Sequence, residues 1–381
     1  MISEGKSEGR HEKLTLSAFG TYATTEIALI GAPCSEIRKS AEKLADLLGK
    51  EKCFYIDADH QSAASDIENI NGFQSAFSDK ISFSRFESFH SIKRHNFRFL
   101  NTKNEIALVN GNHFNASLQL VFLHPEKIES LSRKLDRITN PIAIILHPEI
   151  QEIPPFLKNH FENNNININI ISIEELNSSV IPFILKKSTP QLKALVLAGG
   201  KSERMGQDKT LFNFHGKIQR EYLFEILSNK VEDTYISCRP DQVSDFDSNI
   251  KTIPDRLIGM GPYGAIVSAF MHDPNAAWLV LASDLPFMDK SHIEQLIAER
   301  NPFHSATAFK SPKNGDPEPL AAIWEPSSYP LLLAMMSLGF TCPRKALLQS
   351  DAKSIEAIRS EALLNINTPE DYNKALALLK S

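Results

Sequence analysis

The sequence lacks several features that would point to particular classes of protein. Its four cysteines are scattered, with no pair at CxxC spacing, so neither a disulfide scaffold nor a zinc ribbon is indicated. The longest apolar runs, such as 278–282 and 331–336, are far shorter than the roughly 20 residues that a membrane-spanning helix needs. The first ten residues are polar and charged, so we expect no secretory signal. We therefore expect a reduced, cytoplasmic protein that does not contact a membrane.

An excess of positive charge is also absent. The chain has 41 Lys and Arg residues against 46 Asp and Glu residues, which gives a formal net charge of −5. A protein that binds nucleic acid through its phosphates needs a basic surface, so we expect no nucleic-acid partner. The sequence also contains no HExxH or GxSxG motif, so zinc-hydrolase and serine-nucleophile chemistry lack support.

Short apolar segments alternate with segments of helical periodicity along the whole chain. The expected strands are 27–30, 53–56, 106–109, 142–146 and 168–171 in the first half, and 194–197, 234–237, 278–282, 306–309 and 321–324 in the second. This alternation predicts an α/β fold built from mostly parallel sheets with helices on both faces. The polar stretch 186–191 contains a proline and precedes a fresh strand. We therefore predict two domains, residues 1–189 and 190–381, the second with a Rossmann-like sheet.

A glycine-rich basic loop follows the expected strand at 194–197. It reads LAGGKSERMGQDK over residues 197–209. Paired glycines let backbone N–H groups approach a polyanion closely, and Arg204 and Lys209 offer charges suited to phosphate oxygens. The Walker pattern GxxxxGK[ST] does not fit this loop. A tight turn with solvated charges is the alternative, but the combination of residues favours a phosphate-binding loop.

An acidic residue follows another expected strand of the same half. The strand at 278–282 runs into Ser283, Asp284, Leu285 and Pro286. A carboxylate at the carboxyl end of a parallel strand suits Mg²⁺, which takes one or two protein carboxylates together with waters and substrate phosphates. The alternative is that Asp284 caps the turn that follows it. With the phosphate loop upstream, the metal interpretation is favoured.

The loop at 197–209 resembles the signature of the nucleotidyltransferase family that includes the molybdenum cofactor guanylyltransferases (MobA type). The Asp208-Lys209 pair is more similar to the guanylyltransferase branch than to its cytidylyltransferase relatives. The resemblance implies a nucleotidyltransferase fold, GTP and molybdopterin as substrates, and Mg²⁺ as cofactor. It assigns catalysis to Arg204, Lys209 and Asp284, the last also as the metal ligand. The residues it assigns to nucleotide binding are Leu197, Ala198, Gly199, Gly200, Gly206, Lys209, Ser237, Asp255, Gly261 and Asp284.

The resemblance continues downstream of the loop. Ile253-Pro254-Asp255 matches the end of the family's nucleotide-recognition strand, and a carboxylate can accept hydrogen bonds from guanine N1 and N2. Ser237 falls where relatives carry a small polar residue that contacts the base. Gly261 belongs to GMGPYGAI at 259–266, which matches a turn usually written GPLAGI or GPLGGI, with Tyr263 in place of leucine.

Two further matches lie near the end of the chain. Residues 365–371, NINTPED, match the family's NxNTPED motif. Thr368 and Pro369 are typical of a helix start, which leaves Asn365 and Asn367 for contacts near the metal or the pterin. Glu318 and Arg344 match positions where relatives carry an HP or EP pair and a basic residue, which implies contacts on the acceptor side.

The N-terminal half resembles, more faintly, the P-loop adaptor protein of the same pathway (MobB type). The segment from Gly31 to Ser40 sits where a P-loop would sit but lacks its spacing. One interpretation is a residual nucleotide or pterin site at Gly31, Asp57, Asp59 and His60. The favoured one is a degenerate P-loop-like fold that serves for docking. Molybdoenzymes and cofactor-insertion proteins are then candidate partners.

The resemblance implies transfer of GMP from GTP to molybdopterin, with release of pyrophosphate. Three alternatives stay open. The first is cytidylyl transfer to the same pterin, and the second is nucleotidyl transfer to a sugar 1-phosphate, which the short domain and the NxNTPED segment disfavour. The third is a non-catalytic nucleotide or cofactor carrier.

Overall fold

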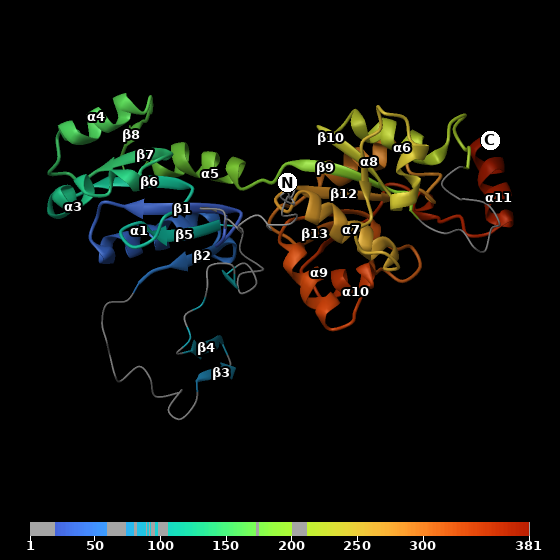
Figure 1. Ribbon diagram of the computed structural model, residues 1–381, viewed down its shortest axis with the longest axis horizontal. Helices are drawn as coiled ribbons and strands as arrows, with labels where there is room; N and C mark the ends of the chain where they lie inside the picture. The colour runs from blue at the N-terminus through green and yellow to red at the C-terminus, as the bar shows by residue number, and fades with distance from the viewer. Residues whose placement is uncertain are drawn as a thin grey trace, which may run out of the picture.

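The computed structural model describes residues 20–58, 74–79, 82–88, 90, 92, 96–97, 106–172, 175–199 and 212–380. The described strands form two large sheets and one separate hairpin. Figure 1 shows the two sheets side by side along the long axis, joined by the chain between α5 (Ile181–Lys187) and β9 (Leu192–Leu197). The proposed domain boundary at 189–190 falls between these two sets of strands, and we keep the division into two domains as a proposal.

The first sheet has six strands, all parallel, in the order β2-β5-β1-β6-β7-β8. Their bounds are β1 Thr25–Ile30, β2 Cys53–Ile56, β5 Ile106–Asn110, β6 Leu118–Leu123, β7 Pro141–Leu146 and β8 Ile170–Ile171. Strands β1, β5 and β6 are buried along their whole length, as expected for a parallel sheet covered on both faces. Helices α1 (Cys34–Leu48) and α5 pack on one face, and α3 (Ile128–Ser132) and α4 (Pro155–Asn163) pack on the other.

Strand β6 is missing from the expectation based on sequence, although it lies beside the central strand β1. Its sequence, LQLVFL, contains a glutamine that is buried in the structure. The Gln119 side chain donates to the carbonyl of Ala116 and accepts from the backbone N–H groups of Thr139 and Asn140, at 2.7, 3.1 and 2.6 Å. These bonds satisfy the amide inside the sheet. Strand β8 is in turn shorter than the expected strand at 168–171.

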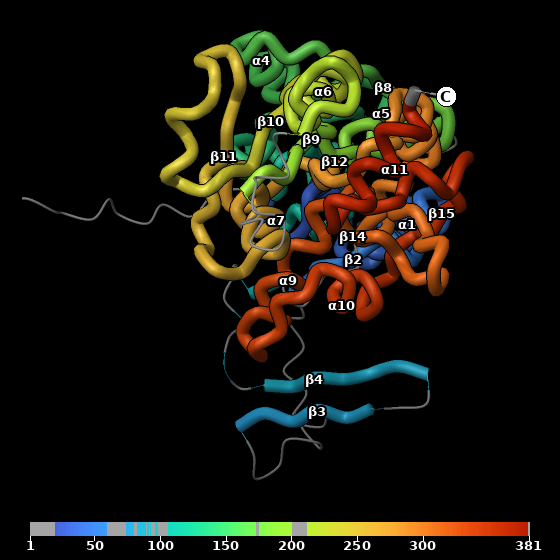
Figure 2. Tube along the Cα trace, turned by 90° about the vertical axis from the view of Figure 1, so that its right-hand side faces the viewer, coloured from blue at the N-terminus to red at the C-terminus, as the bar shows by residue number. Residues whose placement is uncertain are grey.

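A hairpin of β3 (Ser75–Asp79) and β4 (Ser84–Ser88) belongs to neither sheet. Figures 1 and 2 both show it standing apart from the two sheets. It was not expected from the sequence.

The second sheet has seven strands in the order β11-β10-β9-β12-β14-β13-β15. Their bounds are β9 Leu192–Leu197, β10 Asp233–Cys238, β11 Thr252–Pro254, β12 Ala277–Ala282, β13 Ala306–Lys310, β14 Pro317–Trp324 and β15 Lys353–Ile355. All pairs are parallel except those that β14 makes with β12 and β13. The prediction of an α/β fold with mostly parallel sheets is confirmed.

Two layers of helices enclose the second sheet. Alternate residues of β9 face opposite sides, so that Ala194 and Val196 pack under α6 (Gln219–Ser228) and α8 (Lys290–Ala298), while Leu195 packs under α7 (Gly261–His272). Helices α9 (Ser328–Ser337) and α10 (Pro343–Leu348) complete the second layer. The last helix, α11 (Pro369–Lys380), contributes to a smaller cluster with Phe214. None of the helices in the described ranges is long and apolar enough to cross a membrane.

Candidate active site

The carboxyl ends of four neighbouring strands bring most of the described candidate residues to one edge of the second sheet. Strands β11, β10, β9 and β12 are adjacent and parallel. Backbone hydrogen bonds continue past the strand ends, from Ala198 N to Ser237 O at 2.9 Å and from Asp255 N to Cys238 O at 2.9 Å. The Ser283 hydroxyl donates to the carbonyl of Leu197 at 2.7 Å. Hydrogen bonds to backbone groups therefore hold this edge together. Ligands of parallel sheets bind at this edge, outside the carboxyl ends of the strands.

Asp255, Ser237 and Gly199 meet at this edge. The Ser237 hydroxyl donates to Oδ1 of Asp255 at 2.6 Å. A Cβ added to Gly199 would lie 3.0 Å from Oδ2 of Asp255, so a larger residue at position 199 would press on the carboxylate. Burial raises the pKa of Asp255, and the hydrogen bond from Ser237 and the charge of Arg239 oppose that rise. The result is a half-buried, oriented carboxylate beside the glycine that opens the candidate phosphate loop.

Arg239 is a further candidate residue at this edge, which the sequence analysis did not predict. It follows β10 directly, and its guanidinium donates to the Gly199 carbonyl at 3.4 Å. The same guanidinium donates from two nitrogens to the two carboxylate oxygens of Asp241, at 3.1 and 3.2 Å. This bidentate pair orients the guanidinium that contacts the Gly199 carbonyl. Its position just after the end of the expected strand at 234–237 could have indicated it, by the same reasoning that indicated Asp284.

Asp284 lies two residues beyond β12, whose residues are all buried. Its backbone carbonyl accepts a hydrogen bond from Ile366 N at 3.0 Å. Ile366 is the residue between Asn365 and Asn367, so this bond holds the NxNTPED segment against the strand that carries Asp284. The two motifs lie more than 80 residues apart in the chain, and the fold joins them.

Asn365 lines a small cavity of about 100 Å³ next to this segment. Glu318 and Arg344 line the same cavity and form an ion pair at 3.2 Å. Asn367 is not among the described residues that line it. Asp371 accepts from the backbone N–H groups of residues 367 and 368, at 3.1 and 3.0 Å, which closes the start of α11. The expected helix start is therefore present, and Asn365, Glu318 and Arg344 are brought together.

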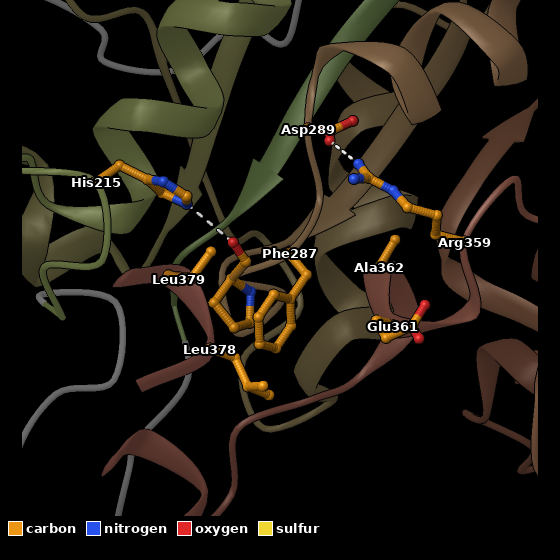
Figure 3. Close-up of a pocket in the computed structure, with 9 residues that line it drawn as sticks. His215, Phe287, Asp289, Arg359, Glu361, Ala362, Leu378 and Leu379 are labelled. Carbon is orange, nitrogen blue, oxygen red and sulfur yellow. Dashed lines mark hydrogen bonds and ion pairs between the residues drawn. The ribbon is translucent and has the colours of Figure 1, made fainter. Parts of the chain in front are cut away.

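A second cavity, of about 410 Å³, lies beside the loop that follows Asp284. His215 contacts the Pro286 carbonyl through Nε2 at 2.9 Å, and Arg359 pairs with Asp289. Figure 3 shows these two contacts together with the apolar side chains of Phe287 and Leu378, which line the same cavity. None of the residues predicted for the site is among its described lining residues.

Several predicted site residues lie outside the described part of the chain. These are Gly200, Arg204, Gly206 and Lys209 of the basic loop, and Asp59 and His60 of the N-terminal half. Gly261 is described, and it begins α7 with a φ of +53°, a conformation that favours glycine.

In the N-terminal half, the carboxylate of Asp57 accepts hydrogen bonds from the Tyr55 hydroxyl, the Asn110 amide and Ala58 N, at 2.8, 2.7 and 2.8 Å. Burial alone would raise the pKa of Asp57, but these three donors bring it below the ordinary value. Gly31 lies at the end of β1 with a φ of +96°. Among the described contacts none joins Gly31 to Asp57, and a nucleotide or pterin site in this half stays a prediction.

Comparison with known proteins identifies relatives of the second half. Residues 194–353 match the family model described as MobA-like NTP transferase domain. A molybdenum cofactor biosynthesis bifunctional protein of Synechocystis is 34% identical over 188 residues, which are 49% of this chain and 54% of the relative. A probable molybdenum cofactor guanylyltransferase of Carboxydothermus hydrogenoformans is 29% identical over 196 residues, 49% of this chain and 96% of the relative.

One solved structure is also similar, that of molybdopterin-guanine dinucleotide biosynthesis protein A from Archaeoglobus fulgidus. It is 25% identical, with a TM-score of 0.42, and the match covers 49% of this chain and 98% of that one. The present chain spans about half the length of the Synechocystis relative.

Proposed function

We propose that this chain transfers GMP from GTP to molybdopterin and releases pyrophosphate, because residues 194–353 match the MobA-like NTP transferase domain. The observation that carries the proposal is the oriented carboxylate of Asp255, which Ser237 holds beside Gly199. The name of the Carboxydothermus relative supports this reaction, and that of the Synechocystis relative supports a role in molybdenum cofactor biosynthesis.

Asp255 selects the base in this proposal. Guanine presents two adjacent N–H donors, at N1 and N2, to a carboxylate that accepts hydrogen bonds only. Cytosine presents one amino donor beside the acceptor N3, which would face the carboxylate lone pairs without a proton between them. The geometry at Asp255 therefore favours guanylyl over cytidylyl transfer.

Mg²⁺ is the cofactor included in the proposal, and Asp284 would hold it. Within the described ranges no group of three or more His, Cys, Asp or Glu side chains suited to a metal is found, and Asp284 is the single carboxylate that this proposal assigns to the ion. That donor set fits Mg²⁺, which keeps several waters and takes other ligands from substrate phosphates. When bound, Mg²⁺ would offset negative charge on the triphosphate.

The protein's own residues position the reactants and neutralise charge, because phosphoryl transfer of this kind needs no covalent intermediate on the enzyme. Arg204 and Lys209, which lie outside the described residues, would offset charge on the triphosphate. On the acceptor side, Arg344 stands in the cavity that Asn365 lines, where a cation would attract the acceptor phosphate. The acceptor phosphate then attacks the α-phosphorus in line with the departing pyrophosphate.

The proposal includes a cytoplasmic location, where molybdoenzymes or cofactor-insertion proteins would receive the product. The non-catalytic carrier is the remaining alternative class. A carrier would bind GTP without releasing pyrophosphate.

Pyrophosphate release in the presence of molybdopterin and Mg²⁺, compared for GTP, CTP and ATP, tests the proposal. We expect release with GTP only. Pyrophosphate release with CTP would indicate cytidylyl transfer instead of guanylyl transfer. Binding of GTP without pyrophosphate release would support the non-catalytic carrier.

A further inference from the structure

A second group of reactive side chains lies in the N-terminal half, at the point where the strand order of the first sheet reverses. The connection after β1 leads to β2 on one side of β1, and the connection after β5 leads to β6 on the other side of β1. Parallel sheets of this kind bind ligands in the crevice outside such a point. Two loops meet there, the one that follows β1 and the one that follows β5. The Asn112 side chain joins them by donating to the carbonyl of Ala32 at 2.9 Å.

A thiol and an imidazole face each other between these loops. Cys34, the first residue of α1, is exposed, and its Sγ lies 3.4 Å from Nε2 of His113. At this distance His113 can take the thiol proton when Cys34 attacks an electrophile. The charge of Asp57 acts on the same imidazole, since the two groups interact electrostatically. A neighbouring carboxylate of this kind favours the protonated imidazole that such a transfer forms.

Two cations stand beside the pair and point to an anionic ligand. Lys134 Nζ donates to the carbonyl of Asn112 at 3.2 Å, and Arg137 donates to the carbonyl of Gly111 at 3.1 Å. Within the ranges that the structure describes, neither cation forms an ion pair with a carboxylate, and both contact backbone of the loop that carries His113. Burial lowers the pKa of Lys134, and the neighbouring charge of Arg137 acts in the same direction. An anion placed here would relieve that repulsion.

The other cysteines lack the features of Cys34, so their reaction rates can be compared with that of Cys34 in the same protein. Burial raises the pKa of Cys53 to about 12 and that of Cys238 to about 11, so both stay protonated at neutral pH. Cys342 is partly buried and precedes α10. The structure pairs a histidine with an exposed thiol at Cys34 only, among the described residues.

We propose that Cys34 is a covalent modification site for anionic low-molecular-weight disulfides. The Cys34 sulfur attacks one sulfur of the disulfide, so that a new S–S bond forms and the original one breaks. The leaving thiolate takes up the proton that His113 accepted from Cys34, and the products are a mixed disulfide on the protein and one free thiol. Lys134 and Arg137 attract the negative groups of the disulfide. This inference does not depend on the reaction proposed for the second half.

The test uses the full chain and glutathione disulfide, which carries net negative charge, with 2-hydroxyethyl disulfide as a neutral counterpart. Peptide mass spectrometry follows the mixed disulfide at each cysteine over time at neutral pH. We expect Cys34 to react about 10-fold faster than Cys342 with glutathione disulfide. His113→Gln should bring Cys34 close to the rate of Cys342.

A variant that removes the two cations distinguishes their attraction of the disulfide from the proton transfer between Cys34 and His113. Lys134→Met with Arg137→Met should slow the reaction of Cys34 with glutathione disulfide about threefold or more, and leave the reaction with the neutral disulfide nearly unchanged. Unfolding midpoints of the variants near that of the parent chain show that they fold. Equal rates at Cys34 and Cys342 in the parent chain would overturn the proposal, whatever the variants do. An unchanged Cys34 rate in a folded His113→Gln variant would overturn the role of His113.

Discussion

Replacing Asp255 with asparagine isolates the carboxylate that we assign to guanine selection. In the proposed complex this side chain accepts two charge-assisted hydrogen bonds, each contributing about 1.5–3 kcal/mol. Asparagine keeps one acceptor but presents an NH₂ group toward a guanine N–H, so one bond is lost and one donor is left without a partner. We expect a loss of about 3 kcal/mol in transition-state binding, or about 100-fold in kcat/KM for GTP.

The fold should tolerate this substitution. Burial raises the pKa of Asp255, so the ionised form is disfavoured in the folded state. Removing the charge therefore does not lower the free energy of unfolding at neutral pH, and the unfolding midpoint should stay equal or rise. A loss of activity with an unchanged midpoint then reports on base recognition rather than on stability.

The assay is steady-state pyrophosphate release with GTP and with ITP, whose base lacks the N2 amino group. The parent enzyme should prefer GTP, and the Asp255→Asn variant should lose most of that preference. Ser237→Ala is the matched control, because it removes only the 2.6 Å bond to Asp255 and should cost about 1 kcal/mol, or about fivefold. An Asp255→Asn variant within about threefold of the parent on GTP would refute the assignment.

Three further substitutions test other parts of the account. Asp284→Asn should abolish turnover while GTP still binds in a direct binding assay, and near-normal turnover would remove Asp284 from the metal site. Arg300→Leu breaks a bidentate pair with the fully buried Glu325, so urea unfolding should show a loss of about 3–5 kcal/mol, and a parent-like midpoint would contradict that estimate. Asp289 caps α8, and although burial alone would raise its pKa, hydrogen bonds from the α8 start lower it strongly. Its contribution is present above its unfolded pKa and is lost as pH falls, so Asp289→Asn should be destabilised by about 1 kcal/mol at pH 7 and by less near pH 3. A pH-independent difference in unfolding free energy would count against this role.

The sequence allowed the fold class to be predicted because buried parallel strands appear as short apolar runs. Strand β6 was not predicted because Gln119 interrupts its apolar run. Two of the three hydrogen bonds that satisfy this amide come from Thr139 and Asn140, which lie 20 and 21 residues away in sequence. The antiparallel direction of β14 could not be predicted either, because strand direction depends on how the chain crosses the sheet and not on local composition.

At the site, the residues that follow strands could be anticipated, since carboxyl ends of parallel strands share one edge. Asp284 was predicted on these grounds. Asp255 and Ser237 were predicted from the family resemblance, and the structure joins them by a hydrogen bond. Arg239 was not predicted, although it directly follows β10. The pairing of Glu318 with Arg344 depends on the packing of α10 beside β14, which no sequence spacing reveals.

The most direct test of the central claim is identification of the product formed from an equimolar mixture of GTP and CTP with molybdopterin and Mg²⁺. Mass spectrometry distinguishes the guanine dinucleotide form of the cofactor from the cytosine form. The account predicts the guanine form together with pyrophosphate. A cytosine dinucleotide as the main product, or unchanged molybdopterin with GTP bound, would contradict it.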